Sequence, residues 1–154
     1  MIKLNEKINK ALIDIDFIER YECLSKKYDS TKTPLNERLR YFDGELIIDS
    51  INSLGYVVDF EKKEKYFKIK EERIEDYTFS VNIILDSGMT DIVWIVKKNQ
   101  ELILGLPIGE FSRMMISSDY KIQKPIFGTY EDLEEIFIVV FKMYEDFKQA
   151  LTGN

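Results

Sequence analysis

The sequence has no histidine, a single cysteine and only three prolines in 154 residues. Without histidine the chain cannot build a Ser-His-Asp or Cys-His catalytic centre, nor a zinc site with imidazole ligands. Cys23 alone forms no disulfide within the chain, and no neighbouring cation in the sequence favours its thiolate. We therefore expect no catalytic residue, no transition metal and no cofactor.

Long apolar runs are missing as well. The longest is Ile136–Phe141, far short of the roughly 18 residues that a membrane-spanning helix needs. The start at Met1–Leu4 continues into charged residues rather than into the apolar stretch of a signal peptide. These features predict a cytoplasmic protein that does not interact with membranes.

What the sequence does contain is typical of one globular domain spanning residues 1–154, with 45% hydrophobic and 32% charged residues. Apolar residues at helical spacing predict a first helix over 5–28 and a second over 34–54. Thr33 would be the N-cap of the second helix, Pro34 its first residue, and Gly55 would follow its end.

Between residues 56 and 106 the apolar period changes to two, which is typical of strands. Short connections favour an antiparallel meander of about five strands. Alternation places Phe79, Val81, Ile83 and Trp94 in the core. Residues 92–96 are apolar on both faces, which predicts a central strand covered by helices.

Residues 107–127 show no clear period and are a candidate functional loop. A long last helix is expected over 129–151, with Thr129 as its N-cap and Asp132 completing a capping box. The predicted fold class is therefore α+β, with the antiparallel meander packed against two N-terminal helices and one long C-terminal helix.

The net charge of −6 comes mainly from two segments. Residues 35–60 carry five acidic and two basic side chains, and residues 129–154 carry six and two. One interpretation is that these acids complement helix dipoles and solvate the surface. The other is an acidic docking face for a basic protein, with apolar anchors in the loop at Phe111, Met114 and Met115 unless these only cap the sheet. The acids assigned to this face are Glu45, Asp49, Glu134, Glu135 and Asp146.

Two further patterns carry weaker signals. Lysines interleave with Tyr66 and Phe67 over residues 62–70, a composition that nucleic-acid surfaces use, but adjacent acids cancel the charge and edge lysines also prevent aggregation. We expect no nucleic-acid partner. A hydrolase acting through paired carboxylates, or through a lysine with Ser112, Ser117 or Ser118, stays open, although no enzyme motif supports it.

The order of elements, the acidity and the segments Gly128–Ile136 and Tyr144–Lys148 resemble the immunity proteins that bacteria encode beside polymorphic or contact-dependent toxins. The resemblance implies a non-catalytic protein that binds a cognate toxin domain and blocks its active site. A basic nuclease toxin would suit the acidic face. A second class, resembling type III secretion chaperones, would hold an extended effector protein along its helices and sheet edge.

Overall fold

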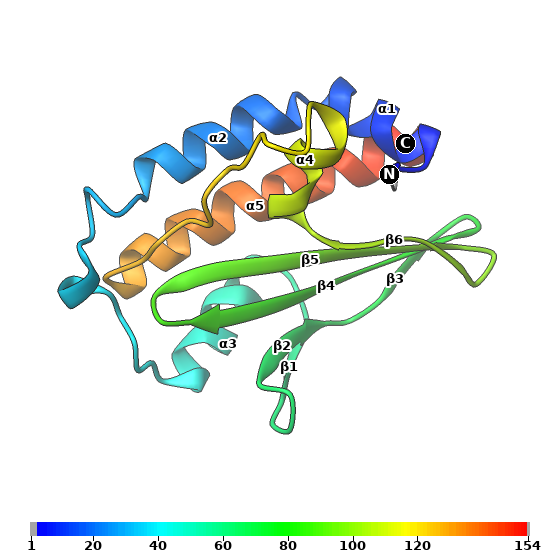
Figure 1. The fold of residues 1–154 in the computed structure, drawn as a ribbon. Coiled ribbons are helices and arrows are strands. Elements are labelled where there is room, and N and C mark those ends of the chain that lie inside the picture. Colours follow the sequence, from blue (N-terminus) through cyan, green and yellow to red (C-terminus); the bar gives the residue numbers. More distant parts are fainter. Residues whose placement is uncertain (1–2, 154) are drawn as a thin grey trace.

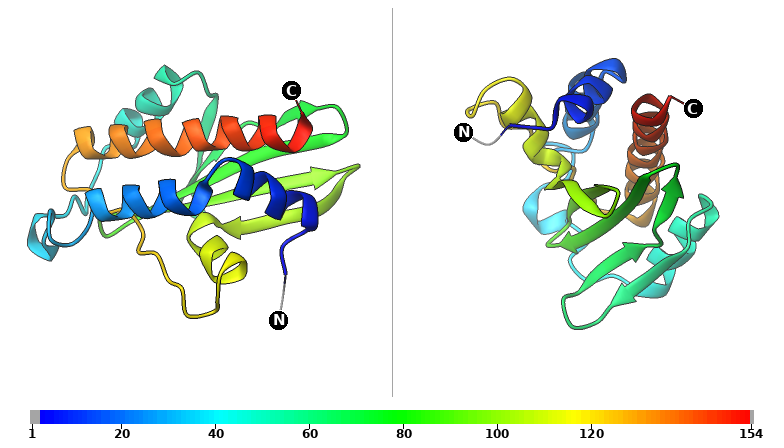
Figure 2. Two further views of the ribbon diagram at one scale, coloured as in Figure 1. Left: turned by 90° about the horizontal axis from the view of Figure 1, so that it is seen from above. Right: turned by 90° about the vertical axis from the view of Figure 1, so that its right-hand side faces the viewer.

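A computed structural model describes residues 3–153 (Figure 1). It shows an α+β fold with an antiparallel sheet, as the sequence predicts, and the helices lie on one face of that sheet. Seen from above, the long helix α5 (Tyr130–Thr152) runs between α2 (Phe17–Lys27) on one side and α3 (Gly44–Ser53) on the other (Figure 2). None of the helices among residues 3–153 has the length and apolar character required to cross a bilayer.

The predicted helix over residues 5–28 is divided in two. The helix α1 (Glu6–Asp14) is capped by Asn5, whose side chain accepts the N–H groups of Lys7 and Ile8, and α2 begins at Phe17. Between them Asp16 adopts a left-handed backbone with φ of 56°, a conformation that aspartate tolerates better than most residues. The two apolar stripes of this segment therefore belong to two helices.

The predicted helix over residues 34–54 is wrong in its first half. A single 3-10 turn, η1 (Leu35–Glu37), is followed by extended chain, in which the Leu39 N–H donates to the Phe127 carbonyl at 3.1 Å. Helix α3 begins only at Gly44, because the Asp43 side chain caps it by accepting the Glu45 N–H. Thr33 is buried and caps no helix.

The end of α3 follows the prediction. Leu54 is its C-cap, and Gly55 comes next with φ of 95°, in the region that glycine adopts most readily.

Within the described residues the sheet has six strands in the order β1-β2-β4-β5-β6, with β3 paired beside β4. All pairings are antiparallel. The short strand β3 was not predicted, because its three residues show no alternation. The strands are β1 (Val58–Glu61), β2 (Tyr66–Ile69), β3 (Glu72–Ile74), β4 (Tyr77–Asp86), β5 (Met89–Lys98) and β6 (Glu101–Pro107).

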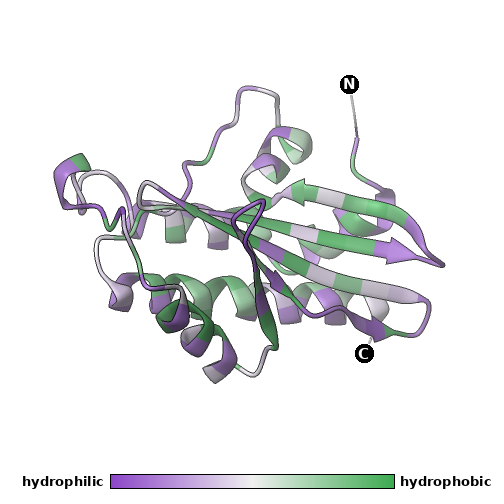
Figure 3. Ribbon diagram, turned by 90° about the horizontal axis from the view of Figure 1, so that it is seen from below, coloured by the Kyte–Doolittle hydropathy of each residue, from purple (hydrophilic) through white to green (hydrophobic). Residues whose placement is uncertain are grey.

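The core lies between the helices and one face of the sheet. Phe79, Val81, Ile83 and Trp94 are completely buried there, which confirms the prediction from alternation. The strand β5 is central, but helices cover only one of its faces, so the predicted two-sided cover is wrong (Figure 3). On the open face Ile95 is half-buried by its neighbours in the sheet.

Candidate functional site

The first turn of α5 is fixed by side chains. The Asp132 N–H donates to the Thr129 hydroxyl at 3.0 Å, which confirms Thr129 as the N-cap. The Asp132 carboxylate accepts the Gly128 N–H at 3.0 Å and pairs with Lys32 at 2.9 Å. Burial alone would raise the pKa of Asp132, but the hydrogen bonds from Lys32 and Gly128 outweigh it and lower the pKa.

Helix α3 is attached to α5 at both of its ends. At its start, the Asp43 N–H donates to the Tyr130 hydroxyl at 2.9 Å. Beyond its end, Gly55 turns the chain and the Tyr56 ring stacks on Phe141 with centroids 4.3 Å apart. The surface between α3 and α5, called here the α3 flank, is therefore held in a defined geometry.

On the opposite side of α5, the α2 flank, acidic side chains are paired with cations of α2 and of α5 itself. Asp146 accepts Arg20 at 2.9 Å and Lys142 at 2.8 Å, and Glu135 lies 3.6 Å from Lys27. Burial alone would raise the pKa of Asp146, but the hydrogen bonds from Lys142 and Arg20 outweigh it and lower the pKa. Two of the predicted docking residues, Glu135 and Asp146, thus engage neighbouring cations on this flank.

The α3 flank contains a cavity of about 300 Å³ between the two helices, called here the acidic groove. Its lining is largely apolar, and it includes Asp49 from α3 and Glu134 from α5. Neither carboxylate has a cation within ion-pair distance among residues 3–153. The cavity is lined by Leu46, Ile47, Asp49, Ser50, Ser53, Tyr130, Leu133 and Glu134.

The structure thus brings two of the five predicted acids, Asp49 and Glu134, to one cavity. Glu45 is exposed on α3, one helical turn before Asp49, but does not line the cavity. Charge summed along the chain could not separate these residues from Glu135 and Asp146, because the pairing cations of α2 are distant in sequence.

Exposed apolar side chains accompany these acids. Leu46, on the wall of the groove, is 47% exposed, and Tyr41, in the extended segment before α3, is 90% exposed. Ile138 is also exposed, one turn along α5 from Glu134. Tyrosine is enriched among the residues that dominate binding energy at protein interfaces. Sequence analysis missed Tyr41 because it assigned this segment to a helix.

A second cavity of about 440 Å³, called here the second hollow, follows along α5 beyond the end of α3. At its base the Lys148 ammonium pairs with Glu72 of β3 and, at 2.8 Å, with Glu145. The Tyr56 hydroxyl donates to Glu145 at 2.5 Å. Burial raises the pKa of Tyr56, and the hydrogen bond and negative charge of Glu145 raise it further, so the hydroxyl stays protonated.

Sequence analysis did not find this cluster, although one signal was present. Lys148 follows Tyr144 by four residues and therefore lies on the buried stripe of α5, where a lysine needs a partner.

The predicted anchor Phe111 is not on the surface. It lies in α4 (Phe111–Met115), is 0% exposed and packs between Phe17 and Trp94, with ring centroids 5.1 and 5.8 Å away. Met114 and Met115 are half-buried, and Met115 packs against the core. Phe111 completes the core because the turn η2 (Ile108–Glu110) directs α4 back over the sheet.

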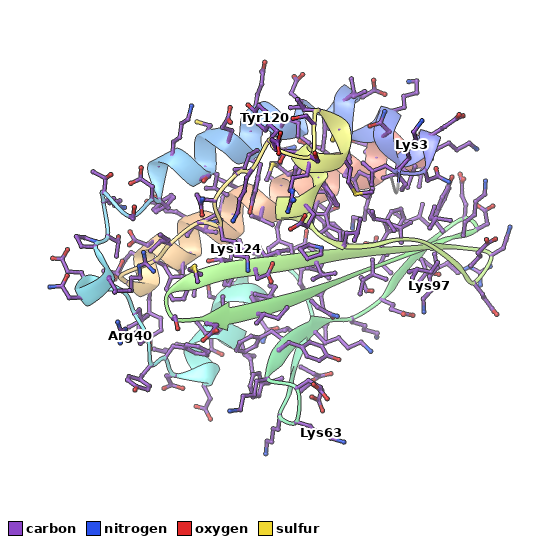
Figure 4. All side chains as sticks on the ribbon, viewed as in Figure 1. Lys3, Arg40, Lys63, Lys97, Tyr120 and Lys124 are labelled. Carbon is purple, nitrogen blue, oxygen red and sulfur yellow. The ribbon has the colours of Figure 1, made fainter. Side chains whose placement is uncertain are left out.

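The rest of the predicted loop, residues 116–127, is attached along α2 and the sheet. The Tyr120 hydroxyl donates to Glu22 at 2.8 Å, and Lys124 pairs with Asp91 at 3.4 Å (Figure 4). The Ser25 hydroxyl donates to a carbonyl of this segment at 2.6 Å. The segment is therefore a strap anchored to α2 and to the sheet.

Lysines of the β1–β2 turn are exposed, as Lys63 illustrates at the far end of the hairpin (Figure 4). Glu61 and Glu64 lie in the same turn, so the charge is mixed. Cys23 is exposed on α2. Among residues 3–153 no group of three or more histidine, cysteine or acidic side chains is arranged to hold a metal ion.

Comparison of the chain with models of known protein families, with curated proteins and with solved structures gave no match.

Proposed function

We propose that the protein is a non-catalytic binding module that docks a basic protein on the acidic groove. The supporting observation is that Asp49 and Glu134 line one largely apolar cavity and have no cation within ion-pair distance among the described residues. Unpaired acids on a surface repel each other and attract a positively charged partner over distances of about 8 Å at physiological ionic strength. The groove is therefore suited to steer a basic surface into contact.

The apolar part of the groove would contribute binding affinity, which charge alone does not supply. Affinity in protein complexes comes mostly from a few buried anchors, whereas charges set association rate and partner choice. An aliphatic or aromatic side chain of the partner would contact Leu46 and Leu133. The resemblance to immunity proteins suggests the kind of partner, namely a cognate toxin domain with a basic active-site surface.

A second candidate function is a chaperone for a secreted effector. It is favoured by β6, a strand at the edge of the sheet, where Leu102 is exposed. An extended client could add a strand at such an edge. In this case binding would depend on β6, not on the acidic groove.

The test is co-expression with the product of the neighbouring gene, followed by purification of the complex and measurement of association kinetics. Cys23, exposed on the opposite flank, accepts a fluorophore for this purpose. Replacing Asp49 and Glu134 together by lysine should slow association tenfold or more at low salt. The matched control reverses Glu19 and Glu64, which are also exposed and lie outside both candidate surfaces, and should leave the rate unchanged.

Three outcomes separate the hypotheses. A complex that forms as fast with the groove variant as with the wild type contradicts groove docking. A complex lost only on changes in β6 favours the chaperone. A complex in which the toxin stays fully active contradicts the hypothesis that the protein inhibits a toxin.

A further inference from the structure

The second hollow combines three kinds of surface. The Tyr56 ring forms an aromatic wall, Leu54 and Val57 form an apolar wall, and Glu72 and Glu145 contribute carboxylates. The ring is held in place because one face stacks on Phe141 and its hydroxyl is bonded to Glu145. The hollow is thus pre-formed before any partner arrives.

The ammonium group at the base of this hollow is fully engaged. Lys148 is only 3% exposed, pairs with Glu72 and Glu145, and lies 4.6 Å from the centroid of the Tyr144 ring. A lysine has three N–H donors, so none remains for an anion from solution. The other lysine of the lining, Lys70, is exposed and is matched in charge by the adjacent glutamate, so the lining as a whole keeps a net negative charge and favours a cation over an anion.

The two carboxylates, in contrast, remain accessible. Glu72 is 52% exposed and Glu145 is 49% exposed, and together they carry one more negative charge than Lys148 neutralises. Each oxygen accepts more than one hydrogen bond, so both groups keep acceptor positions toward the hollow. The accessible polar chemistry is that of a receptor for a cation.

We propose that the second hollow binds a guanidinium group, namely an arginine side chain of the basic protein that docks on the acidic groove. The inference rests on the proposed function. Guanidinium is planar, stacks on aromatic rings and donates in a fork to carboxylates, and its aliphatic stem would contact Leu54 and Val57. An ammonium group would use the carboxylates but not the aromatic wall.

The spacing of the two cavities along α5 defines the partner further. Glu134 and Glu145 are eleven residues apart on one helix, which corresponds to about 16 Å. The partner would therefore present an arginine about 16 Å from the apolar side chain that enters the acidic groove. Two anchors at a fixed separation select among basic partners more strictly than charge alone.

The experiment titrates the full chain with N-acetyl-arginine amide and follows backbone amide shifts by NMR. Saturable shifts should appear at residues 54–57, 70–73 and 144–149. The neutral isostere N-acetyl-citrulline amide should bind at least fivefold more weakly, and N-acetyl-lysine amide should fall between them. Equal shifts with citrulline, or no saturable shift with arginine, would overturn the proposal.

Variants of the chain distinguish a specific pocket from general acidity. Tyr56→Leu removes the aromatic wall without changing charge and should weaken arginine binding severalfold, whereas Glu134→Gln, a control on the other cavity, should not. Glu145→Gln should weaken it too, while keeping an acceptor for the Tyr56 hydroxyl. Equal losses in Glu134→Gln and Glu145→Gln would mean that arginine senses only net charge, which also overturns the proposal.

Failure of this inference can be told apart from failure of the proposed function. If the neighbouring gene product binds the groove but the arginine probe does not bind the hollow, only this inference fails. If the probe binds but no basic protein docks, the hollow stands as a guanidinium site and the docking function fails.

Discussion

The two flanks of α5 are both acidic, yet the structure uses their charge differently. On the α2 flank Arg20, Lys27 and Lys142 neutralise Glu135 and Asp146. On the α3 flank Asp49 and Glu134 face a cavity without such cations among the described residues. The difference shows that formal charge identifies an acidic helix, whereas only the packing partner shows which acids are available to another molecule.

Both flanks rest on the same core, and the largest expected effect comes from breaking it. Val81→Asp places a charge between the sheet and α5, where it has no partner, and should unfold the protein. Asn82→Asp, one residue along β4 on the open face, should leave it folded. Circular dichroism and urea unfolding distinguish the two. A folded Val81→Asp protein would contradict the shared core.

The next largest effect is expected within the α3 flank, at Lys148. Lys148→Ala removes the ammonium from between Glu72 and Glu145 and should lower the free energy of unfolding by about 2 kcal/mol, less than for a fully buried pair because both carboxylates are half-exposed. Lys148→Met keeps the apolar stem and should cost less. A Lys148→Met protein as stable as the wild type would show that packing, not charge, is what Lys148 contributes.

On the α2 flank, Asp146→Asn should lower the free energy of unfolding by about 1 kcal/mol at pH 7. The pKa of Asp146 in the folded protein lies below the ordinary aspartate value of 3.8, so the ionised carboxylate stabilises the fold above that pH. This contribution is lost as pH falls through the lowered pKa. Urea unfolding from pH 7 to pH 3 should therefore show the wild type and the variant converging. A gap that stays constant would contradict the ion-pair explanation.

The smallest effect on stability is expected at the acidic groove. Asp49→Asn and Glu134→Gln together should change the free energy of unfolding by less than about 0.5 kcal/mol, since neither carboxylate holds a cation of this chain within the described residues. The same pair of substitutions should slow association with a basic partner. If the double substitution lowered the unfolding temperature as much as Asp146→Asn does, the proposed difference between the two flanks would be wrong.

The sequence predicted best where local pattern and tertiary role agree. Strict alternation in β4 identified the buried face through Val81 and its neighbours, and the Thr129 cap located the start of α5. The sequence prediction failed where other local interactions outweighed the helical spacing of the apolar residues. Leu35 and Leu39 keep helical spacing, but Asp43 caps a helix that starts later and Leu39 bonds to the strap instead.

The candidate site was less predictable for a different reason. The acids of α3 and α5 were visible as charge, but their pairing depends on neighbours such as Lys32, which lies 100 residues from Asp132. The segment of Phe111 lacks a period, so the sequence leaves open whether this residue is a surface anchor or caps the sheet, because its burial depends on how α4 folds over Trp94. The second hollow is lined by residues of β3, of α5 and of the chain after α3. These segments are far apart in sequence, so no local sequence pattern predicts that they lie together.

The helix α5 covers one face of the sheet but follows the sheet in sequence, so the sheet is synthesised before its cover. When β6 leaves the ribosome, the apolar face that carries Trp94 has not yet received α5, whose buried residues include Phe137 and Phe147. Until α5 emerges, only the N-terminal helices are available to cover that face, and the rest of it is exposed in a nascent chain that also has unpaired strand edges, a state prone to aggregation. Translation that pauses within residues 108–129 should therefore reduce the yield of folded protein more than a pause after α5, and holdase chaperones should restore it.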